Sequence, residues 1–120
     1  MKILRSFAYA WAGIRSCSSS EANFKIHILF ALAAIILGFL LNISPNEWIA
    51  IIICIAFVLA MEMINTAIEK LCDVVQQDIH PGIKKVKDIT AGAVLVAAIG
   101  SFFIGTVIFL PKIILFIKSL

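Results

Sequence analysis

Long stretches without a formal charge constrain this chain most strongly. Lys, Arg, Asp and Glu are absent between Lys25 and Glu47, and again throughout residues 89–110. At about 1.5 Å per residue, a helix over residues 89–110 covers roughly 33 Å, enough to cross a hydrocarbon core of about 30 Å. With 62% hydrophobic and only 14% charged residues, the chain cannot cover itself with a water-facing surface. The sequence therefore predicts an all-α membrane protein.

One domain over residues 1–120 is predicted, with transmembrane spans at 26–43, 48–68 and 89–110. The second helix is expected to continue to about Val75. Turn residues at 42–46 separate the first two spans, and a loop is expected over Gln76–Gly82. Pro111 is expected to end the third span, because proline removes a helical hydrogen-bond donor.

Residues 1–20 have the pattern of an amphipathic helix. Ile3, Phe7, Trp11 and Ile14 recur at helical spacing on one stripe, with basic residues nearby. This pattern is typical of a helix that lies in the membrane surface. The serine-rich stretch 17–20 is expected to break the helix, with Ser20 as the N-cap of the next one.

Basic residues predict the orientation. Eight of the ten lie at the N-terminus or in the segment between the second and third spans; only Lys112 and Lys118 lie elsewhere. The positive-inside rule therefore predicts a bacterial inner-membrane protein with a cytoplasmic N-terminus. The net charge of +3 does not produce the dense basic face that nucleic acid requires, so no nucleic-acid partner is expected.

A polar stripe runs along the second span. Glu62, Asn65, Glu69 and Asp73 are spaced so that they share one face of a helix. Glu62 lies about 21 Å along the helix from Trp48, the expected outer boundary, and is thus still inside the membrane. A carboxylate there costs about 2.5–3.5 kcal/mol on insertion scales, which indicates a functional role. Glu69 lies at the boundary, within reach of water.

These residue types suit phosphoryl transfer to a lipid. Glu62 could accept the proton of a lipid hydroxyl, and Glu69, with Glu21 as a second carboxylate, could bind Mg²⁺. Lys87 could neutralise phosphate oxygens, and Asp88 could orient a neighbour. The phosphate-binding loops of soluble kinases are absent from the sequence, so another scaffold is required.

Two other interpretations remain open from the residues alone. A single intramembrane acid is also a feature of small proton-coupled transporters, although Glu62 is near the membrane edge and its stripe continues into water. A structural assembly subunit would not explain a buried carboxylate. The small residues Ala93, Ala97, Ser101 and Gly105 indicate close helix packing.

Several motifs resemble the bacterial membrane diacylglycerol kinase family. The family's E-x-x-N-[ST]-A-I-E motif is similar to residues 62–69, and its K-D pair to residues 87–88, ahead of the small-residue run 91–95. Its W-x-G-[LI] and E-x-x-F motifs are similar to residues 11–14 and 21–24. The resemblance covers nearly the whole chain, in order.

The resemblance implies a homotrimer of three transmembrane helices plus a surface helix, with active sites shared between neighbouring subunits. It implies Glu62 as the catalytic base, Glu21 and Glu69 as Mg²⁺ ligands, and ATP as co-substrate. Around ATP it implies Tyr9, Glu21, Asn65, Glu69, Asp78, His80, Lys87 and Asp88, with Lys2 as the nearest match to an N-terminal Arg. Along the lipid path it implies Trp11, Asn23, Phe24, Lys25, Trp48 and Glu62.

Two segments look closer to the undecaprenol kinase branch of this family. They are Asn23–His27 and Ile108–Pro111. The diacylglycerol branch tends to have an acidic residue where this chain has His27. The resemblance therefore favours undecaprenol as the lipid alcohol over diacylglycerol.

Overall fold

The computed structural model describes residues 1–75 and 78–120, and within them the regular structure is entirely helical. The helices are α1 (Lys2–Ser20), α2 (Ala22–Leu40), α3 (Pro45–Val75) and α4 (Pro81–Lys118). Three of them, α2, α3 and α4, are long and apolar enough to cross a membrane. The expectation of an all-α membrane protein with three transmembrane helices is confirmed.

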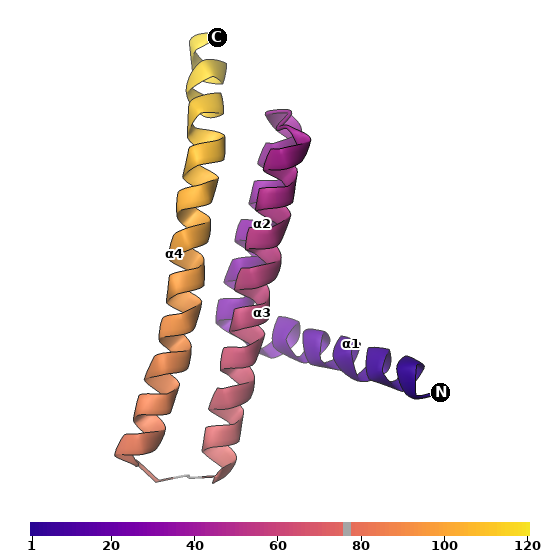
Figure 1. The fold of residues 1–120 in the computed structure, drawn as a ribbon, viewed down its shortest axis with the longest axis vertical. Helices are drawn as coiled ribbons and strands as arrows, with labels where there is room; N and C mark the ends of the chain where they lie inside the picture. The colour runs from indigo at the N-terminus through magenta and orange to yellow at the C-terminus, as the bar shows by residue number, and fades with distance from the viewer. Residues whose placement is uncertain (76–77) are drawn as a thin grey trace.

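α3 is the central helix of the bundle. It packs against α4 most extensively and also against α2, whereas α2 and α4 touch each other little. Figure 1 shows α3 and α4 side by side and α1 running crosswise to them. Most large apolar side chains on these helices stay exposed within the single chain, as expected for surfaces that face lipid or other subunits.

We call the end formed by the start of α4 and the C-terminal part of α3 the site end, and the opposite end the far end. The buried apolar cluster of Ile43, Ile51, Ile108 and Phe109 lies toward the far end. The buried polar residues of α3 lie nearer the site end. The largest apolar cluster and the buried polar residues are therefore offset from each other along the bundle.

The turn between α2 and α3 is fixed by local hydrogen bonds. Asn42 has a φ of 55°, a left-handed conformation that Asn tolerates, and the Ile43 N–H donates to the Gly38 carbonyl at 3.2 Å. The Ser44 hydroxyl accepts from the Glu47 N–H at 3.2 Å, and the Ser44 N–H donates to Glu47 Oε1 at 2.9 Å. This reciprocal pair is a capping box at the start of α3.

Gly38 allows α2 and α3 to approach closely near that turn. A Cβ placed on Gly38 would lie 2.6 Å from Cη2 of Trp48. The Trp48 ring also packs on Phe39, with 4.9 Å between ring centroids. The indole thus fills the space beside a residue that has no side chain.

The serine-rich stretch does not break the first helix, contrary to expectation. α1 continues through Ser20, and the hydroxyls of Ser18, Ser19 and Ser20 are accommodated within it by donating to carbonyl oxygens one turn back, at 2.8, 3.2 and 2.6 Å. The chain bends at Glu21, which has an extended backbone. Glu21, and not Ser20, is the N-cap of α2.

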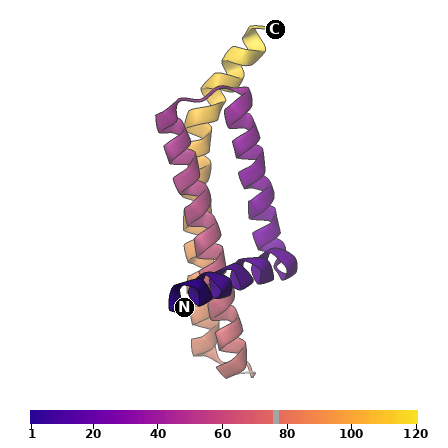
Figure 2. The same cartoon turned by 90° about the vertical axis from the view of Figure 1, so that its right-hand side faces the viewer.

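Pro111 does not end the third long helix either. α4 runs through it to Lys118, and Figure 2 shows the C-terminal part of α4 leaving the direction of the rest of the helix. Apolar residues continue after the proline, so the helix remains favourable after the loss of one donor, at the cost of a bend. At the other end α4 begins at Pro81, its first helical residue. Gln76 and Gln77, where the expected loop begins, lie outside the described residues.

Candidate active site

The polar stripe of α3 is buried where it lies deepest in the bundle. Glu62, Asn65 and Thr66 are only 4, 6 and 4% exposed, and they are the buried polar side chains of the described chain. Glu69 is half-buried and Asp73 is exposed. The stripe therefore passes from a protected environment to an accessible one within one continuous helix.

Asn65 connects the middle of this stripe. Its Nδ2 donates to Oε1 of Glu69, one turn along α3, at 3.3 Å. Its Oδ1 is buried and has no hydrogen-bond partner. A buried acceptor without a donor is costly, so this oxygen is poised for a ligand that brings one or for a cation.

Glu62 faces α2. His27 Nε2 lies 3.8 Å from Glu62 Oε2, and the side chains are 22% and 5% exposed, respectively. His27 was not among the predicted site residues. Its position inside a charge-free apolar run was the available signal, because polar groups within a membrane span tend to be functional.

Ion pairs surround the stripe at the site end. Lys87 Nζ donates to Asp73 Oδ1 at 2.6 Å and joins α4 to α3, while Lys84 and Asp88 pair within α4 at 2.7 Å. The hydrogen bond with Asp73 raises the pKa of Lys87, so its ammonium stays charged at neutral pH. Lys87 is therefore held as a cation beside the accessible end of the stripe.

Glu21 connects α1 and α2 to α3. Its carboxylate lies 3.4 Å from Lys70 Nζ. Among the residues that the structure describes, no three His, Cys, Asp or Glu side chains gather closely enough to hold a metal ion. Within one chain, Glu21 and Glu69 therefore do not form a complete cation site.

The remaining predicted residues divide into three groups. The first group lies on α1 and at the start of α2, where Phe24 is buried at 3% exposure and the others are exposed: Tyr9, Trp11, Asn23 and Lys25. Asp78 is exposed, and His80 caps α4 by accepting from the Gly82 N–H at 3.0 Å. Trp48 lies near the far end, where it packs against α2.

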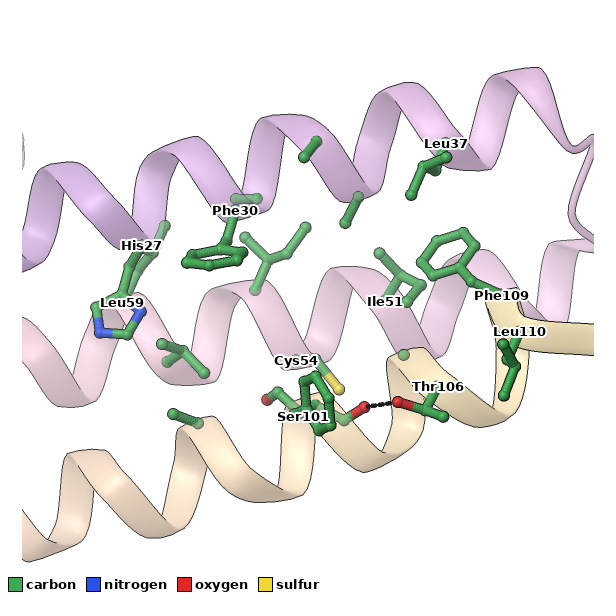
Figure 3. Close-up of a pocket in the computed structure, with 18 of the residues that line it drawn as sticks. His27, Phe30, Leu37, Ile51, Cys54, Leu59, Ser101, Thr106, Phe109 and Leu110 are labelled. Carbon is green, nitrogen blue, oxygen red and sulfur yellow. Dashed lines mark hydrogen bonds between the residues drawn. The ribbon is translucent and has the colours of Figure 1, made fainter. Parts of the chain in front are cut away.

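An apolar cavity of about 710 Å³ lies between α2, α3 and α4. Figure 3 shows His27 at one end of it and Phe109 and Leu110 toward the other. Gly105 lines the cavity, and a Cβ placed on it would meet nothing within 4 Å, whereas Ala97 is buried. Within one chain, the small-residue stripe of α4 is thus only partly used for helix packing.

Three helices long and apolar enough to cross a membrane, with a buried acid on the central one and further acids and cations toward the site end, define a polytopic membrane protein with a polar cluster inside its bundle. The chain belongs to the prokaryotic diacylglycerol kinase family, whose model matches residues 8–109. It is therefore a lipid kinase. The predicted family is confirmed.

Similar proteins carry two different names. The undecaprenol kinase of Bacillus subtilis is 41% identical over 93% of this chain and 91% of its own length. A diacylglycerol kinase of Synechocystis is 36% identical over 92% of this chain and 64% of its own length. The diacylglycerol kinase of Escherichia coli K12 is 28% identical over 82% of this chain and 80% of its own length.

Proposed function

We propose that this kinase transfers the γ-phosphoryl group of ATP to the hydroxyl of a polyprenyl alcohol, undecaprenol, with diacylglycerol as a poorer substrate. The 41% identity to an undecaprenol kinase over nearly the whole chain supports this lipid. The burial of Glu62 at 4% exposure, on the same helix face as the more accessible Glu69, carries the proposal. It lets a hydroxyl from the membrane meet a phosphate from water.

In this proposal Glu62 is the catalytic base. Its carboxylate takes the proton of the lipid hydroxyl. The lipid oxygen thereby becomes a stronger nucleophile for attack on the γ-phosphorus. Lys87, held as a cation by Asp73, neutralises phosphate oxygens. Positioning and charge neutralisation supply most of the rate enhancement in such reactions.

The residues present fit a Mg²⁺ ion. Glu69 offers a carboxylate without a Lys or Arg pair in the described structure, and Asn65 offers a buried oxygen without a donor. Glu69 and Glu21 would hold the ion, which would neutralise charge on the phosphates. Tyr9, Asp78, His80 and Asp88 complete the proposed ATP surface.

We also propose the lipid path, the membrane orientation and the assembly. Trp11, Asn23, Phe24, Lys25 and Trp48 line the lipid path, and α1 lies in the membrane surface on its exposed apolar stripe. The single domain 1–120 sits in the inner membrane with its N-terminus and site end in the cytoplasm. It assembles as a homotrimer with active sites shared between subunits. The comparisons lend no support to the transporter alternative.

Substitution Glu62→Gln tests the base. Purified protein in mixed lipid is given labelled ATP with undecaprenol or diacylglycerol, and lipid phosphate is measured. We expect Glu62→Gln to lose at least about 10²-fold in kcat, since its amide cannot accept the proton, with unchanged helicity and ATP affinity. Glu47→Gln, at the far end, is the matched control and should keep its kcat. Near-normal turnover by Glu62→Gln contradicts the assignment, and a preference for diacylglycerol contradicts the proposed substrate.

A further inference from the structure

We propose that His27 is a positioning residue that acts through Glu62: it orients the carboxylate and carries the abstracted proton toward water. The inference rests on the proposed function, because it presumes that Glu62 is the base. It assigns a proton-transfer role to α2, a helix whose other proposed site residues line only the lipid path.

The need for such a residue follows from the burial of Glu62. The Glu62 side chain is only 5% exposed, so a proton on its carboxyl group has little direct contact with water. A base that cannot release its proton cannot enter the next catalytic cycle. His27 is the nearby group with better access, because its side chain is 22% exposed and its Nε2 lies 3.8 Å from Glu62 Oε2.

The distance fits a relay. At 3.8 Å the two atoms are slightly beyond direct hydrogen-bond range, and a small rotation of either side chain would close the gap. An imidazole ring can accept a proton at one of its nitrogens and release a different proton from the other nitrogen. No other side chain in the described structure forms an ion pair or hydrogen bond with Glu62.

Few other charges act on this pair. Glu69 from α3 and Glu21 from the start of α2 are the further acids that influence Glu62, and Glu21 is itself paired with Lys70. Cys17 of α1 also lies within electrostatic reach of Glu62. α4 contributes Ala98 and Ser101 to the cavity that His27 lines, and neither titrates.

The proposed sequence of events balances in atoms and charge. The O–H bond of the lipid alcohol breaks and its proton goes to Glu62, while the oxygen bonds to the γ-phosphorus. The bond from the γ-phosphorus to the β-phosphate oxygen breaks, and ADP leaves with that electron pair. The proton then moves from Glu62 to Nε2 of His27, and the Nδ1 proton of the imidazole is released to water. Exchange of the ring protons with water restores the tautomer with a free Nε2 before the next cycle.

The cavity provides a direct test by chemical rescue. Because His27 lines a cavity of about 710 Å³, His27→Ala leaves space that free imidazole can occupy. We expect His27→Ala to lose about 10²-fold in kcat, as for loss of a positioned proton-transfer group, with unchanged KM for ATP. Added imidazole should restore activity in proportion to its neutral form. Phe30→Ala, one turn along α2 on the same cavity, is the matched control and should show no rescue.

The pH profile supplies a second readout. Activity needs an ionised Glu62 and a neutral His27, so the wild-type kcat should fall with decreasing pH as the coupled pair becomes protonated. His27→Gln keeps a hydrogen-bond donor near the Nε2 position but cannot relay a proton near neutral pH. Its kcat should be reduced and its acid limb should lose one ionisation.

Two results would overturn the relay. One is a His27→Gln variant with the kcat and pH profile of the wild type. The other combines two findings: a folded His27→Ala variant is inactive and is not rescued by imidazole, and the His27→Gln variant has the pH profile of the wild type. Failure of the proposed function looks different, because then Glu62→Gln stays active or the wild-type protein phosphorylates no lipid alcohol.

Discussion

At the residue scale, the site depends on polar atoms that burial leaves without partners. Glu62 and Asn65 sit in a bundle that offers them few donors, and the unpartnered Oδ1 of Asn65 is the clearest case. A folded protein normally pairs such groups. In the proposed function, the substrates complete this network.

Asn65 should therefore matter for nucleotide binding. We expect Asn65→Ala to weaken Mg²⁺-dependent ATP binding by about 10-fold or more, as loss of a supporting ligand does at metal sites. Asn65→Asp keeps an oxygen acceptor at the same place and should lose less. Isothermal titration with ATP and Mg²⁺ distinguishes the two, and equal affinity in Asn65→Ala and wild type would refute the role.

At the scale of single elements, the far end of the bundle is held by caps and close packing. The capping box of Ser44 and Glu47 starts α3, and Lys112 of α4 lies 3.3 Å from the same carboxylate. These contacts link the turn before α3 to α3 and α4 at a distance from the site. Changes there should affect stability more than catalysis.

Loss of the cap should destabilise the protein. Ser44→Ala removes the hydroxyl acceptor of the Glu47 N–H, and we expect it to cost about 1 kcal/mol, as other N-cap substitutions do. Thermal unfolding in detergent, followed by circular dichroism, measures the change. Ser101→Ala, which removes a hydroxyl from the interior of α4 and not from a helix cap, serves as the comparison. An unchanged Tm in Ser44→Ala would show that the cap contributes nothing.

The same cap predicts a pH effect. Hydrogen bonding from the Ser44 N–H, followed by contact with Lys112, lowers the pKa of Glu47 from its ordinary value of 4.5. A lowered folded-state pKa stabilises the fold above the unfolded value, and this contribution is lost as the pH falls through the folded pKa. Below about pH 4.5, the Tm of the wild type should fall more steeply than that of Glu47→Gln. Parallel curves would exclude the effect.

Close packing at Gly38 should also be sensitive. Gly38→Ala places a carbon 2.6 Å from Trp48, so α2 and α3 must separate or the indole must move. We expect a loss of about 1–3 kcal/mol, typical of overpacking. Gly100→Ala, where a side-chain carbon meets nothing within 4 Å, is the control and should be tolerated. Equal Tm values for the two variants would show that the packing at Trp48 yields easily.

The sequence predicted the helices well and their ends less well. Charge-free runs locate α2 and α4, and a run with the single charge of Glu62 locates the spanning part of α3, because lipid tolerates few alternatives to a helix. α1 ends at Ser20, within the predicted range 1–20, but the predicted break within 17–20 and the N-cap at Ser20 were wrong. The predicted stop at Pro111 was also wrong, since apolar residues carry α4 past its proline. Helical spacing predicted the shared face of Glu62 and Glu69. It could not predict the contact with His27, because that depends on how α2 and α3 are rotated against each other.

At the scale of the whole molecule, the proposed chemistry is expected to draw on more than one chain. In the described residues Glu21 pairs with Lys70, and no group of three ligands gathers around Glu69. Large apolar surfaces also remain exposed on every spanning helix. Both observations support an assembly in which a neighbouring subunit completes each site.

Mixing two inactive variants tests this assembly. Glu21→Gln and Glu69→Gln should each be inactive alone if both carboxylates bind the ion. The two variants are then co-reconstituted at equal amounts. In a closed ring, up to about one quarter of the sites would receive Glu21 from one subunit and Glu69 from its neighbour, and these sites would recover activity. Crosslinking measures the subunit number in the same sample. Absence of recovery in mixed trimers would place both carboxylates in one subunit.

The continuity of α3 has a consequence for how such kinases diverge. One unbroken helix fixes the distance between Glu62, the proposed base for the lipid hydroxyl, and Glu69, the proposed ligand on the nucleotide side, so neither can be moved without shifting the other. We expect adaptation to a new lipid to occur on the flanking helices instead. A different residue at position 27 of α2, for example, changes the surroundings of Glu62 and leaves the distance between Glu62 and Glu69 intact. α3 keeps the two carboxylates at a constant separation, and selectivity for the lipid can vary through residues of α2 and α4.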